Sequence, residues 1–427
     1  MKKYIEVYEK IRNMIISGEI KSGDKIPSIR RASEYFGVSI TTVQNAYFEL
    51  CADGYLIAVD KSGYYASDIM NKAEDIAEPE NTGKPIKYDL TGTADESSFD
   101  FTLWQRYIKS ALRQTQRMGT YSEPEGEYDL RSAISDYIKQ KRNIIASPQR
   151  IIIGAGVGAL MQVLASLLKD RHTVSFPDGS FEQGIGIFSD YGYKVHTRFK
   201  DAEIIYVSPS HMTKWGDVMP IKRRLELIEY SKKNDSLVIE DDYESEFLYN
   251  SKPTPSLYTL GKDNIVYIGS FSAMLLPGIR ISFMILNDEL LTIYNSKRKL
   301  YSQTASKTEQ IALGAYIRDG HLAYRTRKIR RLYTAKTRQL AEYLSKEIKG
   351  AETDIGENAL QIILSCEFHG SPEVFEKNGI RLYIKEIKNN RITLVISPTG
   401  VEQKELYNCA LTVKKSIGQR IFVRVVH

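Results

Sequence analysis

The sequence predicts two parts of different fold class: a small α+β head with a winged helix-turn-helix, and a large α/β body. Three observations predict this division. Residues 1–67 carry short helical patterns and then a hairpin pattern. Residues 68–90 contain Asp, Glu, Asn and Pro without periodicity, as a linker does. In residues 91–427 apolar runs alternate with amphipathic segments, which is typical of a mostly parallel sheet covered by helices.

Composition and charge narrow the class of protein. The chain has 427 residues, 42% of them hydrophobic, which is enough for two or three globular cores. The net charge of +6 permits contact with nucleic acid without establishing it. There is neither an apolar signal core at the start nor a run of ~18 apolar residues, so we expect a cytoplasmic protein that does not cross a membrane. Cys51, Cys366 and Cys409 are too far apart for a metal motif.

The head contains three predicted helices and a hairpin. After a helix over residues 4–16, Ser28 caps a second helix, Ile29–Phe36, which ends at Gly37. Ser39 caps a third helix that starts at Ile40 and continues to residue 50. Two short helices joined by a turn that contains glycine predict a helix-turn-helix. Residues 54–59 and 63–66 then predict a two-stranded wing.

The third helix begins with short polar side chains: Thr41, Thr42, Gln44 and Asn45. A recognition helix contacts base edges through its N-terminal residues, so polar groups at these positions favour binding to double-stranded DNA. The alternative is a helical domain that binds protein, because the acidic and basic residues of the head nearly balance.

The motifs Pro-Ser-x-Arg at 27–30 and Gly-Val-Ser-x-Thr-Thr-Val at 37–43, followed by the wing, resemble the GntR winged helix over residues 4–66. The resemblance implies backbone contacts from the two arginines, base contacts from the helix and further contacts from the wing. Ile40 departs from the family, which commonly has arginine there. The implied DNA-binding residues are Arg30, Arg31, Ser39, Thr41, Thr42, Gln44, Asn45, Lys61 and Gly63.

The body has predicted strands that each lead into a loop with polar or glycine residues. These strands cover residues 151–153, 204–207, 237–240 and 265–268. The carboxyl ends of parallel strands share one edge of a sheet, where α/β proteins bind ligands. After the last strand, Ser270, Ser272 and Arg280 suit a phosphate. The alternatives are solvated loops, close packing at the glycines, and an arginine that pairs with a carboxylate.

Residues 269–280 resemble the motif Ser-x-Ser-Lys-(x)-Pro-Gly-x-Arg of fold-type I aminotransferases. With the head, the whole chain resembles the MocR branch of the GntR regulators. This resemblance implies a three-layer aminotransferase fold that forms a homodimer, with a large subdomain over about 120–320 and a small one over about 321–427. It extends through residues 121–126, 208–211, 240–247, 310–313 and 327–330.

The resemblance also implies a pocket for pyridoxal 5′-phosphate. Asp241 would pair with the pyridine nitrogen, Tyr243 would bond the ring hydroxyl, and His211 would lie beside the ring. An aromatic side chain near Phe181 would stack on it. The phosphate would be held by Ser270, Ser272 and Arg280 with the amides of Ala155, Gly156 and Val157. The family's arginine for a substrate carboxylate is expected within residues 392–397, where the chain has Thr393, with Arg391 only nearby.

Ala273 stands where the family has its Schiff-base lysine, and no lysine flanks it. Alanine cannot form the covalent bond, so we expect no catalytic residue and no enzyme activity. Pyridoxal phosphate is then expected to bind without a covalent bond, if the site still binds it. The sequence leaves open whether the lysine was replaced by engineering or lost naturally.

Our main hypothesis is a transcription regulator of MocR/GntR type whose body binds a pyridoxal-phosphate-type or amino-acid-related effector. One alternative is a pyridoxal-phosphate-dependent aminotransferase with a regulatory head. The other is a dimerisation scaffold whose pocket binds nothing. The sequence does not give the effector, the operator, or the choice between activation and repression.

Overall fold

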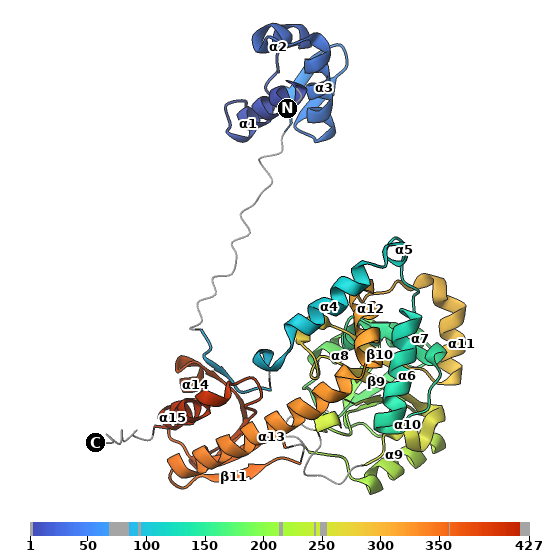
Figure 1. Cartoon of the computed structure of the whole chain (residues 1–427), viewed down its shortest axis with the longest axis vertical. Coiled ribbons are helices and arrows are strands. Elements are labelled where there is room, and N and C mark those ends of the chain that lie inside the picture. Colours follow the sequence, from blue (N-terminus) through green and yellow to red (C-terminus); the bar gives the residue numbers. More distant parts are fainter. Residues whose placement is uncertain are drawn as a thin grey trace. The chain divides into compact units, whose positions relative to one another are not determined.

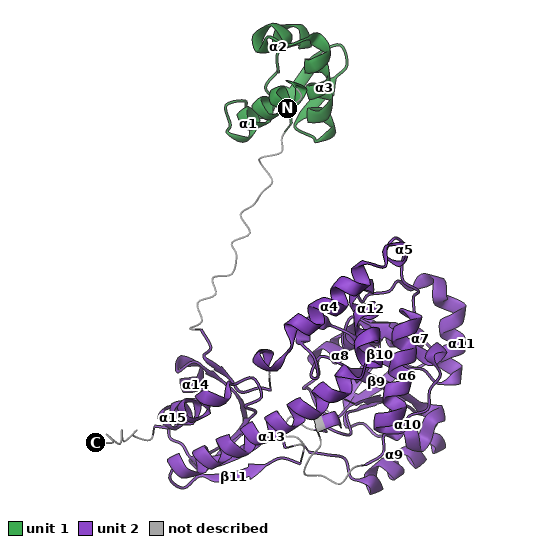
Figure 2. Cartoon of the chain, in the orientation of Figure 1, with its two compact units in different colours: residues 1–83 green, residues 84–427 purple. Residues whose placement is uncertain are grey.

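The computed structural model describes residues 3–67, 85–92, 95–212, 217–242, 245–247, 254–357 and 359–418. The chain divides into two compact units, residues 1–83 and residues 84–427 (Figures 1 and 2). Tyr243, one of the predicted site residues, lies outside the described residues. Within the described ranges, no helix combines the length and the apolar character that crossing a membrane requires.

The head confirms the predicted helix-turn-helix and wing. Its elements are α1 (Lys3–Ile16), α2 (Ile29–Phe36), α3 (Ile40–Ala52), β1 (Leu56–Val59) and β2 (Gly63–Ala66). The Ser28 hydroxyl accepts a hydrogen bond from the Arg31 amide at 3.4 Å, and Ser39 caps α3 in the same way. Gly37, with φ 62°, ends α2 in the left-handed conformation that glycine adopts without strain.

The core of the head lies between α1 and α3. Residues at helical spacing on α1 pack against the buried side of α3, which includes Val43, Tyr47 and Leu50. The Tyr47 hydroxyl donates to the carbonyl of Pro27 at 2.8 Å, which satisfies a polar group inside this core. The packing leaves the opposite side of α3 exposed.

The body is organised around a mixed sheet, in which the described residues form seven strands in the order β4-β10-β9-β8-β7-β5-β6. Only β10 is antiparallel to its neighbours. All four strands predicted from the sequence are confirmed. The strands are β4 (Ile151–Gly154), β5 (Thr173–Phe176), β6 (Lys194–Thr197), β7 (Ile204–Val207), β8 (Leu237–Asp241), β9 (Ile265–Ser270) and β10 (Ser282–Ile285).

Helices cover both faces of this sheet (Figure 1). Successive residues of a strand face opposite sides, and β9 accordingly places Ile265 and Tyr267 in one apolar cluster and Val266 and Ile268 in another. The helices are α4 (Phe101–Leu112), α5 (Thr115–Met118), α6 (Tyr128–Arg142), α7 (Val157–Leu167), α8 (Glu182–Asp190), α9 (Ile221–Lys233), α10 (Leu257–Gly261), α11 (Asp288–Lys297) and α12 (Lys307–Arg318).

A smaller sheet follows toward the C-terminus, with the order β11-β12-β15-β14 within the described residues. It packs with α14 (Val374–Lys377) and α15 (Leu406–Ser416) around a separate apolar cluster. The strands are β11 (Glu352–Ile355), β12 (Ile362–Glu367), β14 (Tyr383–Lys388) and β15 (Arg391–Ile396).

The linker predicted over residues 68–90 extends too far toward the C-terminus. Residues 88 and 89 form β3 (Tyr88–Asp89), which pairs in parallel with β13 (Ile380–Arg381), and Leu90 is fully buried. The sequence did not indicate this pairing because a two-residue strand has no detectable period, and its partner lies far away in the chain.

The longest described helix, α13 (His321–Glu347), runs from the part of the body with the large sheet to the part with the small sheet (Figure 1). Its first half contributes Leu322 and Ile329 to the core of the large sheet. Its second half contributes Leu340 and Leu344 to the core of the small sheet. One continuous helix therefore belongs to both cores.

Candidate functional site

The predicted ligand-site residues gather at one edge of the large sheet. Strands β4, β5, β7, β8 and β9 all end there, and a cavity of about 390 Å³ lies beyond them. This volume is in the usual range for small-molecule sites. Seven of the nine predicted residues line the cavity: Gly156, Val157, His211, Asp241, Ser270, Ser272 and Arg280.

Arg280 lies against Gly156 at this edge. A Cβ atom placed on Gly156 would stand 2.6 Å from the guanidinium Nη2, and Gly156 has a φ of 86°, so only glycine fits between them. Arg280 itself adopts a left-handed backbone, with φ 48°. Arg280 is exposed to solvent, and among the described residues no carboxylate pairs with it. An anionic group in the cavity would compensate its positive charge.

Three serine hydroxyls lie beside this arginine-lined part of the cavity. Ser282 Oγ donates to Ser270 Oγ at 3.0 Å, and Ser270 Oγ lies 3.4 Å from Ser272 Oγ. The sequence prediction did not include Ser282. It is the first residue of the antiparallel strand β10 and is paired in register with Ser270. Hydroxyls that can rotate to donate suit a phosphate.

The glycine loop before α7 provides amides, but not all those predicted. α7 begins at Val157, directly after Gly156, and no side chain caps it. Its first amides are therefore available to an anion in the cavity. The amide of Ala155, by contrast, donates to Thr304 Oγ1 at 2.9 Å, and Ala155 does not line the cavity. The prediction that Ala155 contributes its amide to a phosphate is therefore wrong, because that amide already donates to Thr304.

Asp241, at the end of β8, is 7% exposed and lines the cavity. Tyr206 donates to its Oδ2 at 2.5 Å. No donor among the described residues reaches the buried Oδ1, and the same is true for the buried hydroxyl of Ser208, which also lines the cavity. Burial raises the pKa of Asp241 to about 6, although the hydrogen bond from Tyr206 opposes this. A ring N–H donor would satisfy the unpaired oxygen.

The two carboxylates that flank Asp241 have structural partners. Glu240 accepts from the amides of Leu257 and Tyr258, both at 2.8 Å, and burial raises the pKa of Glu240. Asp242 forms a buried ion pair with Arg142 at 2.8 Å. Strand alternation turns these two side chains away from the face that Asp241 occupies. Only one of the three consecutive acidic residues is therefore available to a ligand.

Aromatic side chains form a further wall of the cavity. Phe181 stacks on Tyr206 with ring centroids 5.2 Å apart and an interplanar angle of 24°, and both line the cavity with His211. The sequence placed an aromatic near Phe181 in contact with a ligand ring, and this position agrees with that expectation. Tyr206 was missed, because the pattern of a buried strand does not show which hydroxyl meets a carboxylate from the next strand.

Ala273 follows Ser272 in a half-buried position, and its methyl group packs against the apolar core of the large sheet. Arg325 of α13 holds the loop that contains Ala273. Its Nε donates to the Met274 carbonyl at 2.6 Å, and its Nη2 donates to the Leu275 carbonyl at 3.3 Å. Sequence analysis did not identify Arg325. Arg325 binds backbone carbonyls, which every residue has, so the sequence of the loop does not indicate these contacts.

The small sheet contributes one residue to the cavity, Tyr383 of β14. A register shift lies between Ile384 and Glu386, next to this tyrosine, and such bulges change the direction of nearby side chains. Thr393 does not line the cavity and its Oγ1 lies 2.9 Å from Ser365 Oγ, while Arg391 pairs with Glu352 at 3.0 Å. The described lining therefore has one arginine, Arg280, and contains neither lysine nor cysteine.

The arrangement can bind but offers no amine to form a covalent bond. A flat heteroaromatic phosphate would place its anion near Arg280 and the serines and its ring N–H near Asp241. The cavity meets these requirements through buried, unpaired polar atoms and an uncompensated cation.

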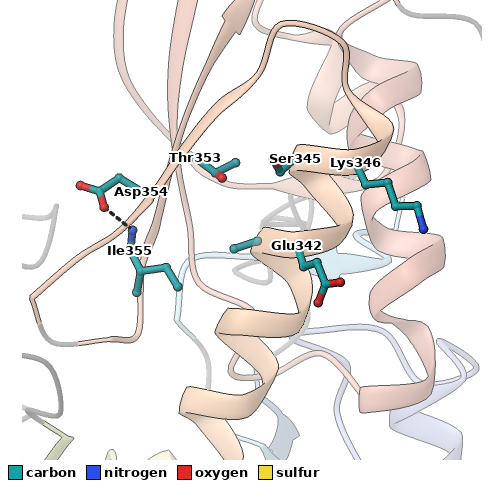
Figure 3. A pocket seen from close by; sticks show the side chains of 7 residues that line it. Glu342, Ser345, Lys346, Thr353, Asp354 and Ile355 are labelled. Atoms are coloured by element: carbon teal, nitrogen blue, oxygen red, sulfur yellow. Dashed lines mark hydrogen bonds between the residues drawn. The ribbon is translucent and has the colours of Figure 1, made fainter.

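A larger cavity of about 710 Å³ lies between the second half of α13 and β11 (Figure 3). Its charged residues are Glu342, Lys346 and Asp354, all of which are exposed to solvent. Asp354 accepts a hydrogen bond from the Ile355 amide at 2.9 Å. Solvent satisfies these charges, and no described residue that lines this open groove has a buried polar atom without a partner, so the groove gives no comparable argument for a ligand.

The predicted DNA-binding residues lie on the outer side of the head. Seven of them are exposed, and Thr42 and Gly63 are half-buried. Ser39 and Thr42 bond to each other through their hydroxyls at 2.8 Å, and Ser39 Oγ accepts from the Thr42 amide at 3.2 Å. These two residues therefore form the cap of α3, which leaves Thr41, Gln44 and Asn45 as the polar side chains exposed on its first turns.

Comparison with known families matches both units. The family described as bacterial regulatory proteins, gntR family, matches residues 3–65. Aminotransferase class I and II matches residues 95–204 and 198–367. The two matches follow the division of the structure into a head and a body.

Relatives with similar sequences extend over nearly the whole chain. The HTH-type transcriptional regulator YdeL of Bacillus subtilis (strain 168) is 31% identical over 408 residues, which cover 89% of this chain and 88% of YdeL. The HTH-type pyridoxine biosynthesis transcriptional regulator PdxR of Corynebacterium glutamicum is 25% identical, with 85% and 83% covered. The probable rhizopine catabolism regulatory protein MocR of Rhizobium meliloti is 25% identical, with 80% and 78% covered.

Solved structures agree on the fold of the body. An archaeal alanine:glyoxylate aminotransferase superposes with a TM-score of 0.67 at 18% identity, covering 79% of this chain and 92% of that chain. LysN, an α-aminoadipate aminotransferase of Thermus thermophilus complexed with N-(5′-phosphopyridoxyl)-L-leucine, gives 0.63 at 19% identity, with 77% and 90% covered. The chain therefore belongs to the MocR type of the GntR family, helix-turn-helix transcription regulators that carry an aminotransferase class I and II domain.

Proposed function

We propose that this regulator binds a pyridoxal-phosphate-type effector in its body, without a covalent bond and without turning over a substrate. One observation carries the proposal. Three groups that lack a described partner line the same cavity of about 390 Å³: the guanidinium of Arg280, the buried Oδ1 of Asp241 and the buried hydroxyl of Ser208. Unpaired polar groups inside a protein are costly, and the oxygens of Asp241 and Ser208 are such groups. Arg280 is exposed to solvent and adds a cation without a described carboxylate partner at the same cavity, so the three groups together favour a polar, anionic ligand.

Each end of such a ligand has a matching group. Arg280, with Ser270 and Ser272, would hold the phosphate by charge-assisted hydrogen bonds. The first amides of α7 would add donors on the same side. Asp241 would accept the ring N–H, and its charge would then be neutralised by the pyridinium. His211 and Phe181 line the space that is left for the ring.

The proposal excludes catalysis because the reactive amine is absent. Bound pyridoxal phosphate supplies an aldehyde and an electron-withdrawing ring, and aminotransferases use a lysine to hold that aldehyde and to move the proton. Ala273 has no group that can do either. Support for a ligand of this class comes from the names of related proteins, since PdxR is named for pyridoxine biosynthesis and LysN was solved with a phosphopyridoxyl compound.

The nature of the effector follows from the lining. An amino-acid adduct would need a second cation for its carboxylate, but Arg391 is paired with Glu352 outside the described lining. Tyr383 occupies part of the lining from the small sheet and offers only a hydroxyl. We therefore favour a free pyridoxal or pyridoxamine phosphate over an adduct with an amino acid.

The effector would act on DNA binding through the body. We propose a homodimer that presents two heads to an operator, because a ligand changes DNA affinity only by binding better to one arrangement of a two-state assembly.

A binding experiment tests the ligand proposal. Calorimetric titration of the full chain with pyridoxal phosphate and pyridoxamine phosphate is expected to give saturable binding of both. Arg280→Ala should weaken the binding by about tenfold or more, since a charge-assisted contact to phosphate is lost. Arg223→Ala is a matched control, because Arg223 is exposed on α9 and, within the described part of the chain, forms an ion pair only with Glu226. Binding that is unchanged in Arg280→Ala would contradict the proposed site.

Absorbance separates the remaining alternatives. The unmodified chain with pyridoxal phosphate should show only the spectrum of a free aldehyde, whereas Ala273→Lys should give a covalent adduct that absorbs visible light. Covalent capture or amino-group transfer by the unmodified chain would instead favour an aminotransferase with a regulatory head. No binding of either vitamer would favour the dimerisation scaffold.

A further inference from the structure

Ile40 is an apolar residue in an unexpected place. It is the first residue of the recognition helix α3, and its side chain is 52% exposed. It does not belong to the apolar cluster of the head, which includes Val38 and Val43 on either side of the cap. Val38 and Val43 occupy the positions of the hydrophobic staple that fixes the start of a helix. Folding of the head therefore gives no reason for an isoleucine at position 40.

The neighbours of Ile40 show what this part of the helix presents to the outside. The hydroxyls of Ser39 and Thr42 are engaged in the cap. The side chains at the helix start that are exposed and outside this cap are Ile40 and Thr41. Gln44 is exposed one turn later on the same side as Ile40, because residues four apart are neighbours on a helix.

The major groove offers one apolar group that an isoleucine can distinguish. Each base pair presents donors and acceptors there, and thymine alone adds a C5-methyl group. Isoleucine has no donor or acceptor, so it gains nothing specific from the polar edges of the other bases. The N-terminal residues of a recognition helix lie closest to the base edges.

We propose that Ile40 determines sequence specificity by packing on the C5-methyl group of a thymine in the major groove, next to the bases contacted by Thr41 and Gln44. The inference rests on the binding of DNA by the head. It commits the operator to a thymine at one position of each half-site.

The test uses the full chain and removes single methyl groups from the DNA. Selection from random duplexes first gives the bound sequence, and each dT in it is then replaced by deoxyuridine, which lacks only the C5-methyl. One dT per half-site is expected to matter, with affinity lowered by about fourfold on replacement, the equivalent of about 0.8 kcal/mol for one buried methyl. With Ile40→Ala, the same replacement should have no effect.

Two further variants make the result specific. Ile57→Ala is the matched control, since Ile57 lies on β1 of the wing and is also 52% exposed; it should keep the sensitivity to deoxyuridine. Ile40→Arg should change the preferred base at that position from thymine to guanine, because arginine bonds the O6 and N7 atoms of guanine. The Ile40→Ala and Ile40→Arg variants should both still bind duplex DNA.

The outcomes separate this inference from the DNA-binding proposal. If no duplex is bound at low salt, the DNA-binding proposal fails, and this inference fails with it. If DNA is bound but no deoxyuridine lowers the affinity, only the role of Ile40 is wrong. The role of Ile40 is also wrong if deoxyuridine lowers the affinity as much for Ile40→Ala as for the unmodified chain.

Discussion

Asp241 is the residue at which stability and binding are in conflict. Its pKa is raised to about 6 in the folded chain from an ordinary value of 3.8, mainly by burial. The folded state therefore binds more protons than the unfolded state between about pH 4 and 6, and stability falls as pH rises through that window. Above it, the ionised carboxylate costs up to about 3 kcal/mol. A ligand with a ring N–H would recover much of that cost.

Asp241→Asn is accordingly expected to stabilise the ligand-free chain and to weaken its binding of pyridoxal phosphate. The gain in the free energy of unfolding should be larger at pH 7.5 than at pH 5, where the Asp241 carboxyl of the unmodified chain is largely protonated. Chemical denaturation at the two pH values measures the difference, and calorimetric titration measures the affinity.

Asp242→Asn is the matched comparison for this prediction. It removes the partner of the buried Arg142 and should destabilise the chain by about 3 kcal/mol at pH 7.5. If Asp241→Asn destabilised the chain as much as Asp242→Asn, the carboxylate of Asp241 would be a structural group like its neighbour, and the argument for a ligand at its Oδ1 would be lost.

Residues at the site differ in how far the sequence revealed them. The end of a buried strand predicted acidic residues at the ligand edge, and the resemblance to aminotransferases then singled out Asp241. Its partner Tyr206 and the contact from Thr304 to the Ala155 amide could not, since each joins residues far apart in the chain. Side-chain contacts of this kind depend on the final packing, which the local pattern of polar and apolar residues does not encode.

At the scale of elements, the recognition helix depends on its cap. Ser39 satisfies the Thr42 amide at the start of α3, and Ser39→Ala should cost about 1 kcal/mol of local stability. Hydrogen exchange of the α3 amides in the full chain should then be about fivefold faster. Thr41→Ala is the control, because Thr41 is exposed next to the cap; its exchange should stay unchanged or slow slightly, since alanine favours helix. Equal hydrogen exchange in Ser39→Ala and in the unmodified chain would mean that the cap contributes nothing to local stability.

Elements with strong local signals were predicted well. The caps Ser28 and Ser39, the turn at Gly37 and the four strands predicted for the large sheet agree with the structure, whereas β5, β6 and β10 were not predicted. These features are encoded within a few residues by capping chemistry and by runs of apolar residues. The strand at Tyr88 was missed because it exists only through its partner β13.

At the scale of the molecule, the two units should unfold as separate transitions. Differential scanning calorimetry of the full chain is expected to give two transitions. Pyridoxal phosphate at about 100 times its dissociation constant should stabilise only the transition of the body, by about 2.7 kcal/mol. If the body is a homodimer, its transition temperature should also rise with protein concentration, while that of the head should not. A single transition that shifts with pyridoxal phosphate and also with protein concentration would show that head and body form one cooperative unit.

Helix α13 has a mechanical consequence for any response to a ligand. Its 27 residues make a rod of about 40 Å, and Arg325 near its start is tied to the carbonyls that follow Ala273. A packed helix tilts as a rigid body. A tilt of α13 by only about 3° at the cavity would therefore displace its C-terminal end by about 2 Å. The small sheet and its helices would move with that end. A ligand that binds in the cavity would in this way displace a distant surface of the body by a rigid-body motion of one helix.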